Sequence, residues 1–162
     1  MTDALKFLQQ INNPFKLRFF LISKLPSAYF SGVRVLVADE EKCVVTVPYK
    51  WFSKNPFRST YFACHSMAAE MSTGVLAMAH LYKRDPPVSM LVTRVVGDFT
   101  KKAIGRTSFT CEDGDKIKEA IEEAITSREG RTITARSCGR NAAGDIIAQF
   151  EITWSFKVRA GS

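Results

Sequence analysis

The residues from Ser59 to Tyr82 form a stretch in which Glu70 is the only formally charged residue. Apolar side chains recur every three or four residues along it, which predicts a helix with one continuous apolar face. The members of that face are Met67, Met71, Val75, Met78 and Tyr82. Alanine and glycine elsewhere on the helix let other elements approach closely. We therefore expect a central, buried helix around which the rest of the chain must wrap.

Strand patterns surround this helix on both sides in the sequence. The expected strands cover residues 32–38, 43–49, 88–100, 106–112, 132–140 and 145–158. The first two predict a hairpin. The last strand alternates apolar and polar residues over its whole length, which predicts a sheet with one face buried. An amphipathic helix is expected at 115–127, and Gly97 is expected to mark a β-bulge.

This order of elements predicts an α+β fold, in which a curved antiparallel sheet wraps around the long central helix. Residues 1–30 predict additional N-terminal helices, and Asn13-Pro14 is typical of the start of the second one. The length of 162 residues suits one domain, with 1–30 as an N-terminal helical extension and 31–160 as the core. A cone-shaped sheet with helices at its N-terminus is the alternative.

The net charge of +7 favours an anionic partner. The basic residues are dispersed, without an arginine-rich tract or a recognition helix, so we expect no nucleic acid partner. No apolar run is long enough to predict a membrane span. Asp3 and the absence of a basic region before an apolar run do not suit a signal peptide, so a cytoplasmic protein is expected. The four cysteines lack metal-ligand spacing, and we predict no metal and no cofactor.

The run from Asn55 to Ala63, followed by Ala68-Ala69-Glu70, resembles the hotdog-fold thioesterase superfamily. The resemblance is to its phenylacetyl-CoA thioesterase-like branch, in which an Asn before the central helix precedes an acidic residue on that helix at this spacing. The N-terminal segment resembles a branch that is classed as a domain of unknown function. Where the thioesterase branch carries His-Gly-Gly, this chain has Tyr61-Phe62-Ala63.

The resemblance implies an acyl-CoA thioesterase-like hydrolase with an acyl-CoA or related thioester as its substrate. Glu70 would be the general base or nucleophile, and Asn55 would orient the water or the acid. The backbone around Tyr61, Phe62 and Ala63 would bind the substrate carbonyl. Arg84, Lys101 and Arg106 are candidate cations for the CoA moiety. The site would lie between two protomers of a homodimer or tetramer.

Other functions remain open at this stage. A non-catalytic acyl-binding or acyl-CoA-binding protein would keep the fold without the chemistry. A purely structural dimer would use Glu70 in a salt bridge. Enoyl-thioester hydratase chemistry usually pairs a His with the acid, but His65 lies five positions before Glu70, away from its helical face.

Overall fold

The computed structural model describes residues 2–159 of the chain. Its elements, in chain order, are α1 (Asp3–Ile11), α2 (Pro14–Lys24), α3 (Pro26–Ser31), β1 (Arg34–Ala38), β2 (Cys43–Val47), a 3₁₀ turn (Trp51–Ser53), α4 (Phe62–Leu81), β3 (Val88–Phe99), β4 (Thr107–Cys111), α5 (Gly114–Ser127), β5 (Arg131–Arg140) and β6 (Ile146–Val158). The α+β order predicted from the sequence is confirmed.

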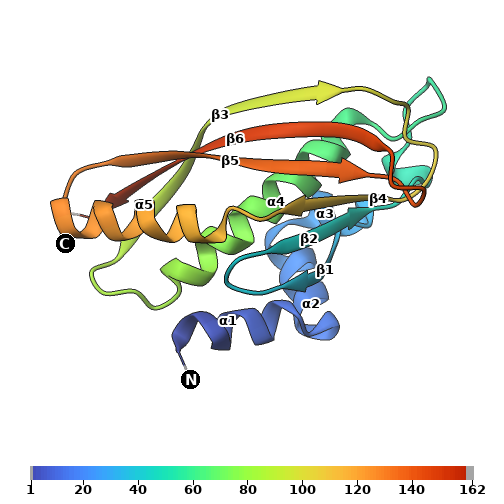
Figure 1. Cartoon of the computed structure of the whole chain (residues 1–162). Coiled ribbons are helices and arrows are strands. Elements are labelled where there is room, and N and C mark those ends of the chain that lie inside the picture. Colours follow the sequence, from blue (N-terminus) through green and yellow to red (C-terminus); the bar gives the residue numbers. More distant parts are fainter. Residues whose placement is uncertain (1, 160–162) are drawn as a thin grey trace.

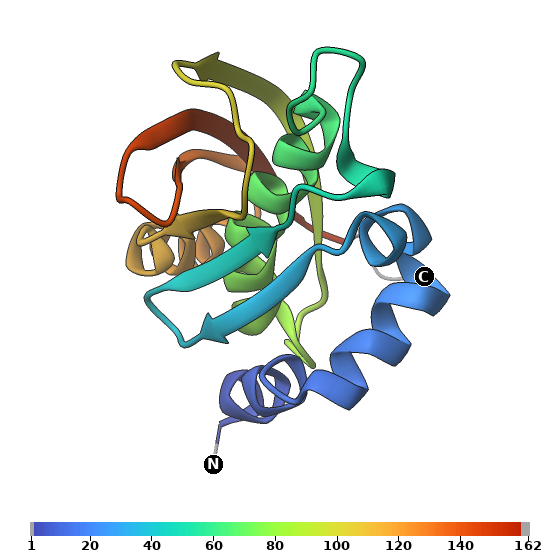
Figure 2. The ribbon, with the colours of Figure 1, turned by 90° about the vertical axis from the view of Figure 1, so that its right-hand side faces the viewer.

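One six-stranded antiparallel sheet runs in the order β1-β2-β4-β5-β6-β3. The sheet curls around α4, which lies along its concave face (Figures 1 and 2). The inward-facing side chains of β6, including Phe150, Ile152 and Phe156, are buried in the core. The indole Nε1 of Trp154 donates a hydrogen bond to Thr73 Oγ1 of α4 over 2.9 Å. The apolar residues that alternate with polar ones along the last strand therefore form the face that packs against the central helix.

The N-terminal helices lie along the side of α4 that the sheet leaves open (Figure 2). Asn13 begins α2, where its Oδ1 accepts hydrogen bonds from the backbone N–H groups of Phe15 and Lys16, each over 3.1 Å. Pro14 occupies the first turn, where its missing N–H costs nothing. Leu17 and Leu21 are buried. This extension adds a helical wall to one side of α4.

Pro26 follows the end of α2 and begins the short helix α3. One local expectation needs correction. The irregularity in β3 lies between Val92 and Arg94, and the bulge expected at Gly97 is wrong. Gly97 instead pairs with Phe150, and a Cβ at Gly97 would lie only 2.8 Å from Phe150 Cε1. The glycine is explained by that close approach of a core ring.

Candidate functional site

Glu70 lies in the middle of α4 and is half-buried. Its carboxylate forms no hydrogen bond or ion pair with any residue in the described range 2–159. Burial raises the pKa of the Glu70 carboxyl above its ordinary value of 4.5. One helical turn later, a Cβ placed on Gly74 would lie 3.3 Å from Glu70 Oε1 and 3.3 Å from Trp154 Cζ2. The carboxylate is thus held against the backbone of α4 without a compensating partner.

Glu70 opens into a cavity of about 280 Å³ between α2 and α4, which we call the α2–α4 cavity. Its walls are Ile11, Leu17, Phe20, Leu21, Lys24, Leu25, Glu70, Met71, Gly74, Val75, Met78 and Met90. Glu70 and Lys24 are the only charged residues among them. An unpaired carboxylate in apolar surroundings is the arrangement that makes a carboxyl usable as a base near neutral pH.

A second cavity, of about 570 Å³, lies at the start of α4, and we call it the α4 N-terminal cavity. Its walls are Asn55, Pro56, Phe57, Ser59, Thr60, Tyr61, Phe62, His65, Phe99, Thr100, Lys101, Lys102 and Ala103. Four of the residues predicted from the sequence line it: Asn55, Tyr61, Phe62 and Lys101. The structure brings these four together from the loop before α4 and the segment after β3.

The start of α4 has no capping side chain at Tyr61. The backbone N–H groups of Phe62 and Ala63 donate to no acceptor among residues 2–159, whereas Cys64 N donates to Tyr61 O over 2.9 Å. Free N–H groups at a helix start, together with the positive end of the helix dipole, favour negative charge. The backbone at Phe62 and Ala63 is therefore a suitable donor pair for a developing oxyanion.

Asn55 uses its side-chain amide to shape its own loop. Its Oδ1 accepts from the backbone N–H groups of Phe57 over 2.9 Å and Ser59 over 3.2 Å. Its Nδ2 donates to Ser59 Oγ over 3.1 Å and to Thr60 O over 3.4 Å. The amide is half-buried within these contacts. Asn55 thus fixes the loop that precedes α4, and the hydrogen bonds that its side-chain carbonyl accepts come from within that loop.

The cations predicted from the sequence lie in different places. Lys101 pairs with Asp145 over 2.6 Å, and Arg106 is exposed in a hollow that adjoins the α4 N-terminal cavity. Arg84 pairs with Glu122 beyond the opposite end of α4. Because α4 has 20 residues, these two ends are about 30 Å apart at 1.5 Å per residue. Arg84 therefore does not share a site with Lys101 and Arg106 in one protomer.

The two cavities have no lining residue in common. Glu70 contributes to one, while Asn55 and the free N–H groups of α4 belong to the other. Within a single protomer, the predicted acid and the predicted carbonyl-binding backbone therefore face different spaces. Sequence spacing along one helix did not reveal this separation.

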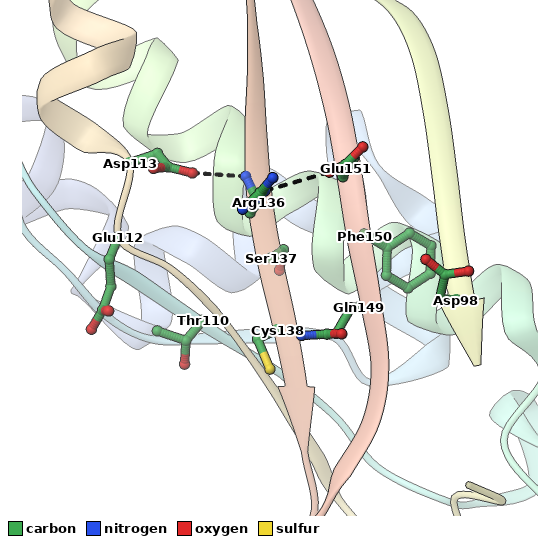
Figure 3. Close-up of a pocket in the computed structure, with 10 residues that line it drawn as sticks. All are labelled: Asp98, Thr110, Glu112, Asp113, Arg136, Ser137, Cys138, Gln149, Phe150 and Glu151. Atoms are coloured by element: carbon green, nitrogen blue, oxygen red, sulfur yellow. Dashed lines mark hydrogen bonds and ion pairs between the residues drawn. The ribbon is translucent and has the colours of Figure 1, made fainter. Parts of the chain in front are cut away.

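A third hollow, of about 390 Å³, lies on the face of the sheet away from α4 (Figure 3). It is lined by the acidic residues Asp98, Glu112, Asp113 and Glu151. Asp113 Oδ2 accepts a hydrogen bond from Arg136 N over 2.8 Å, and Arg136 Nε lies 3.4 Å from Glu151 Oε1. An acidic hollow whose one cation is already paired is a poor site for a phosphate-bearing ligand.

Sequence reasoning missed three residues that the structure places around Glu70: Lys24, Gly74 and Met90. One signal for Lys24 exists, because the chain between Asp3 and Asp39 contains basic residues but no acidic one. Gly74 was recognised only as a small residue on the helix. The sequence contains no signal for Met90, because its place at the cavity depends on the pairing of β3 with β6, which the sequence does not show.

Two features are absent from the described residues. No cluster of three or more His, Cys, Asp or Glu side chains within residues 2–159 is arranged to hold a metal ion. In the same range, no helix combines the length and apolar character that crossing a membrane requires.

The antiparallel sheet curled around one central helix is the hotdog fold, and the comparison with solved structures confirms this fold. A protein of unknown function from Pseudomonas aeruginosa, described as a probable thioesterase, superposes with a TM-score of 0.76 at 17% identity. The match covers 91% of this chain and 97% of that one. No protein-family model and no curated protein matches the sequence.

Two further solved structures show the same architecture. A protein of unknown function from Chlorobaculum tepidum gives a TM-score of 0.72 at 15% identity, over 90% of this chain and 97% of that one. A thioesterase from Haemophilus influenzae gives a TM-score of 0.65 at 10% identity, over 91% of this chain and 93% of that one. At these identities the likeness concerns the fold.

Proposed function

We propose that this chain is an acyl-CoA thioesterase-like hydrolase in which Glu70 is the general base or the nucleophile. The observation that carries the proposal is the Glu70 carboxylate, which is unpaired among the described residues and opens into an apolar cavity. Its raised pKa supports a role in proton transfer. Hotdog-fold neighbours that are described as thioesterases support the same reaction class.

As a general base, Glu70 would take a proton from a water molecule that attacks the thioester carbonyl carbon. The carbon–sulfur bond would then break, giving a carboxylic acid and a thiol that receives the proton. As a nucleophile, the carboxylate would itself attack the carbonyl carbon, the carbon–sulfur bond would break to release the thiol, and water would hydrolyse the resulting mixed anhydride to the carboxylic acid and free Glu70. In both routes the free N–H groups of Phe62 and Ala63 are suited to stabilise the oxyanion.

Because these groups face a different cavity from Glu70, we propose that the working site forms between two copies of the chain. The edge strand β3 supports this arrangement. Val95 pairs with the buried Ile152 and shares its face of the sheet, yet Val95 is 49% exposed. Phe99 pairs with the buried Ala148 and is 50% exposed. An uncovered inner face beside an unpaired strand edge is suited to a second copy.

The test is thiol release from a panel of short, long and aryl acyl-CoAs, with the wild type and Glu70→Gln side by side. We expect Glu70→Gln to lower kcat/KM by about 10²-fold or more, because the base is lost while the shape is kept. Glu119→Gln, at an exposed position of α5 that lines neither cavity, is the matched control and should leave the rate unchanged. Absence of thiol release from every substrate would end the hydrolase proposal.

The pH dependence gives a second readout. A base must be ionised, so kcat/KM of the wild type should rise with pH through the raised pKa of Glu70, at a value above 4.5. A rate that is independent of pH across that range would argue against Glu70 as the base.

A non-catalytic acyl-binding protein is the second candidate. One observation favours it: apart from Glu70 and Lys24, the side chains that line the α2–α4 cavity are apolar, so a single copy has little there to polarise a carbonyl. This function predicts that acyl-CoA binds with the same affinity to the wild type and to Glu70→Gln, with turnover in neither. Calorimetric titration of both proteins distinguishes the two candidates.

A further inference from the structure

The walls of the α2–α4 cavity have a chemistry that the proposed reaction does not use. Apart from Glu70 and Lys24, every side chain that lines it is aliphatic, thioether or phenyl. Such a lining removes apolar surface from water but offers no partner to a polar or charged ligand group. The part of a ligand that enters this space must therefore be a hydrocarbon.

The volume of about 280 Å³ lies near the lower end of the range of about 300–1,000 Å³ that is typical of small-molecule sites. Met71, Met78 and Met90 line the cavity from α4 and β3. Methionine is unbranched and flexible, so these walls adapt to chains of somewhat different length. A short or medium aliphatic chain matches this size and lining better than a long chain.

Gly74 provides the space next to the carboxylate. A Cβ at this position would lie 3.3 Å from both Glu70 Oε1 and Trp154 Cζ2, which is tighter than ordinary contact. Trp154 is held in place by its hydrogen bond to Thr73. A glycine within a helix costs about 1 kcal/mol relative to alanine, so its presence here needs a packing reason. The lack of a side chain at Gly74 lets Glu70 and Trp154 pack close to the backbone of α4 in the wall that also carries Met71 and Met78.

The charge around the cavity is asymmetric. Lys24 lies at its rim and is exposed, while Glu70 is half-buried within it. Between Asp3 and Asp39 the sequence contains basic residues only: Lys6, Lys16, Arg18, Lys24 and Arg34. Of these, Lys24 lines the cavity, and its exposed ammonium group suits the phosphate-bearing carrier of a thioester. The carboxylate within it disfavours an acyl chain that ends in a negative charge.

We propose that the α2–α4 cavity is the acyl subsite, and that it takes the thioester of a neutral, unbranched aliphatic acid of short to medium length. Gly74 and Met78 are its specificity-determining residues, since both line the cavity and a methyl group added at Gly74 would crowd the Glu70 carboxylate. The inference rests on the proposed function for its thioester, but binding tests it without turnover.

The chain contains two tryptophans, Trp51 and Trp154. Trp51 is 72% exposed and does not line the cavity, so Trp51→Phe leaves Trp154, next to Gly74, as the sole tryptophan. In a Trp51→Phe, Glu70→Gln background, titration with hexanoyl-CoA and decanoyl-CoA should produce a saturable change in tryptophan fluorescence. Palmitoyl-CoA and phenylacetyl-CoA should bind at least about 10-fold more weakly, a difference of 1.4 kcal/mol. The anionic glutaryl-CoA should also bind more weakly, because the apolar lining disfavours a terminal carboxylate even without the charge of Glu70.

Gly74→Ala should weaken the binding of decanoyl-CoA about 10-fold or more, and Met78→Ala should shift the preference toward longer chains. Gly130→Ala is the matched control, because the nearest atom to its added Cβ is 4.0 Å away and the position lies outside the cavity. Thermal unfolding of each variant shows whether the fold is retained.

Each outcome tests the proposed acyl subsite independently of the proposed hydrolysis. A chain-length profile that follows the Gly74 and Met78 variants supports the subsite even when no enzyme form hydrolyses a thioester. A profile that these variants leave unchanged overturns it, even if Glu70-dependent turnover is observed. Tightest binding of the aryl or the anionic acyl-CoA overturns the proposed substrate class.

Discussion

His65 shows how burial changes the titration of a single side chain. It lies in the first turn of α4, is only 3% exposed, and neither ring nitrogen has a hydrogen-bond partner among the described residues. Its ring lies near the rings of Phe99 and Phe109, with centroid distances of 6.2 and 5.5 Å. Burial lowers the pKa of His65 from 6.5 to about 4, so the imidazole is neutral at pH 7.

This depressed pKa predicts a loss of stability in acid. An unfolded His65 takes up a proton below pH 6.5, whereas the folded form resists protonation until about pH 4. The contribution of neutral His65 to the free energy of unfolding is therefore complete above pH 6.5. It is lost as the pH falls toward 4, by roughly 3 kcal/mol in total. Replacing His65 with a side chain that does not titrate should remove this loss of stability in acid.

Urea unfolding of the wild type and of His65→Phe at pH 7 and pH 4.5 measures the effect. The free energy of unfolding should fall less for His65→Phe than for the wild type between these two pH values. His65→Leu serves as a second variant in case the larger ring does not fit. Equal losses in all three proteins would mean that His65 has a partner that keeps its pKa ordinary.

At the scale of elements, the helix α2 connects stability with the proposed ligand site. Its inner side packs Leu17 and Leu21 into the core, and its flank supplies Phe20 and Lys24 to the α2–α4 cavity. The asparagine that begins this helix was predicted from the Asn-Pro pair, and the structure confirms its capping hydrogen bonds. The α2 wall of the cavity is a helix of only 11 residues, so the capping of α2 contributes to its stability.

Asn13→Ala should lower the free energy of unfolding by about 1 kcal/mol, because two backbone N–H groups lose their acceptor. Asn13→Asp keeps a side-chain oxygen at the same place and should restore stability. Chemical denaturation of the three proteins measures this. Equal stability of Asn13→Ala and the wild type would show that α2 does not depend on this cap.

The element predictions succeeded where a periodic pattern was long. The central helix and the last strand were both expected within a few residues of their observed bounds, because apolar periodicity over many residues follows directly from burial on one face. The bulge in β3 was misplaced, because the register of a strand is set by its neighbour rather than by its own sequence.

At the scale of the whole molecule, the proposed assembly of two copies depends on the edge strand β3. Its inner face is only partly covered by α4, because Val95 is 49% exposed and Phe99 is 50% exposed although its ring lies near that of His65. Val95→Lys would place a charge on that face, which a monomer tolerates because the residue is half-exposed, but which opposes pairing with a second copy. We expect the wild type to be a homodimer or a larger assembly and Val95→Lys to be a monomer.

Light scattering coupled to size-exclusion chromatography measures this difference directly. Ile104→Lys is the control, because Ile104 is 73% exposed in the loop after β3 and should not affect assembly. A monomeric wild type would remove the proposed site between two copies. In that case the α2–α4 cavity would stand as a binding site within one chain.

The sequence alone determined the α+β class, the central helix and the isolated charge of Glu70 on it, because one charge in a long apolar helix is visible without a structure. Only the tertiary structure decided what surrounds that charge. The packing of α2 against α4 creates the cavity, and the paths of the loops carry Asn55 and Lys101 to the other end of the helix. Local patterns record which face of an element is buried. They do not record which distant elements meet, because those contacts depend on packing across the whole fold.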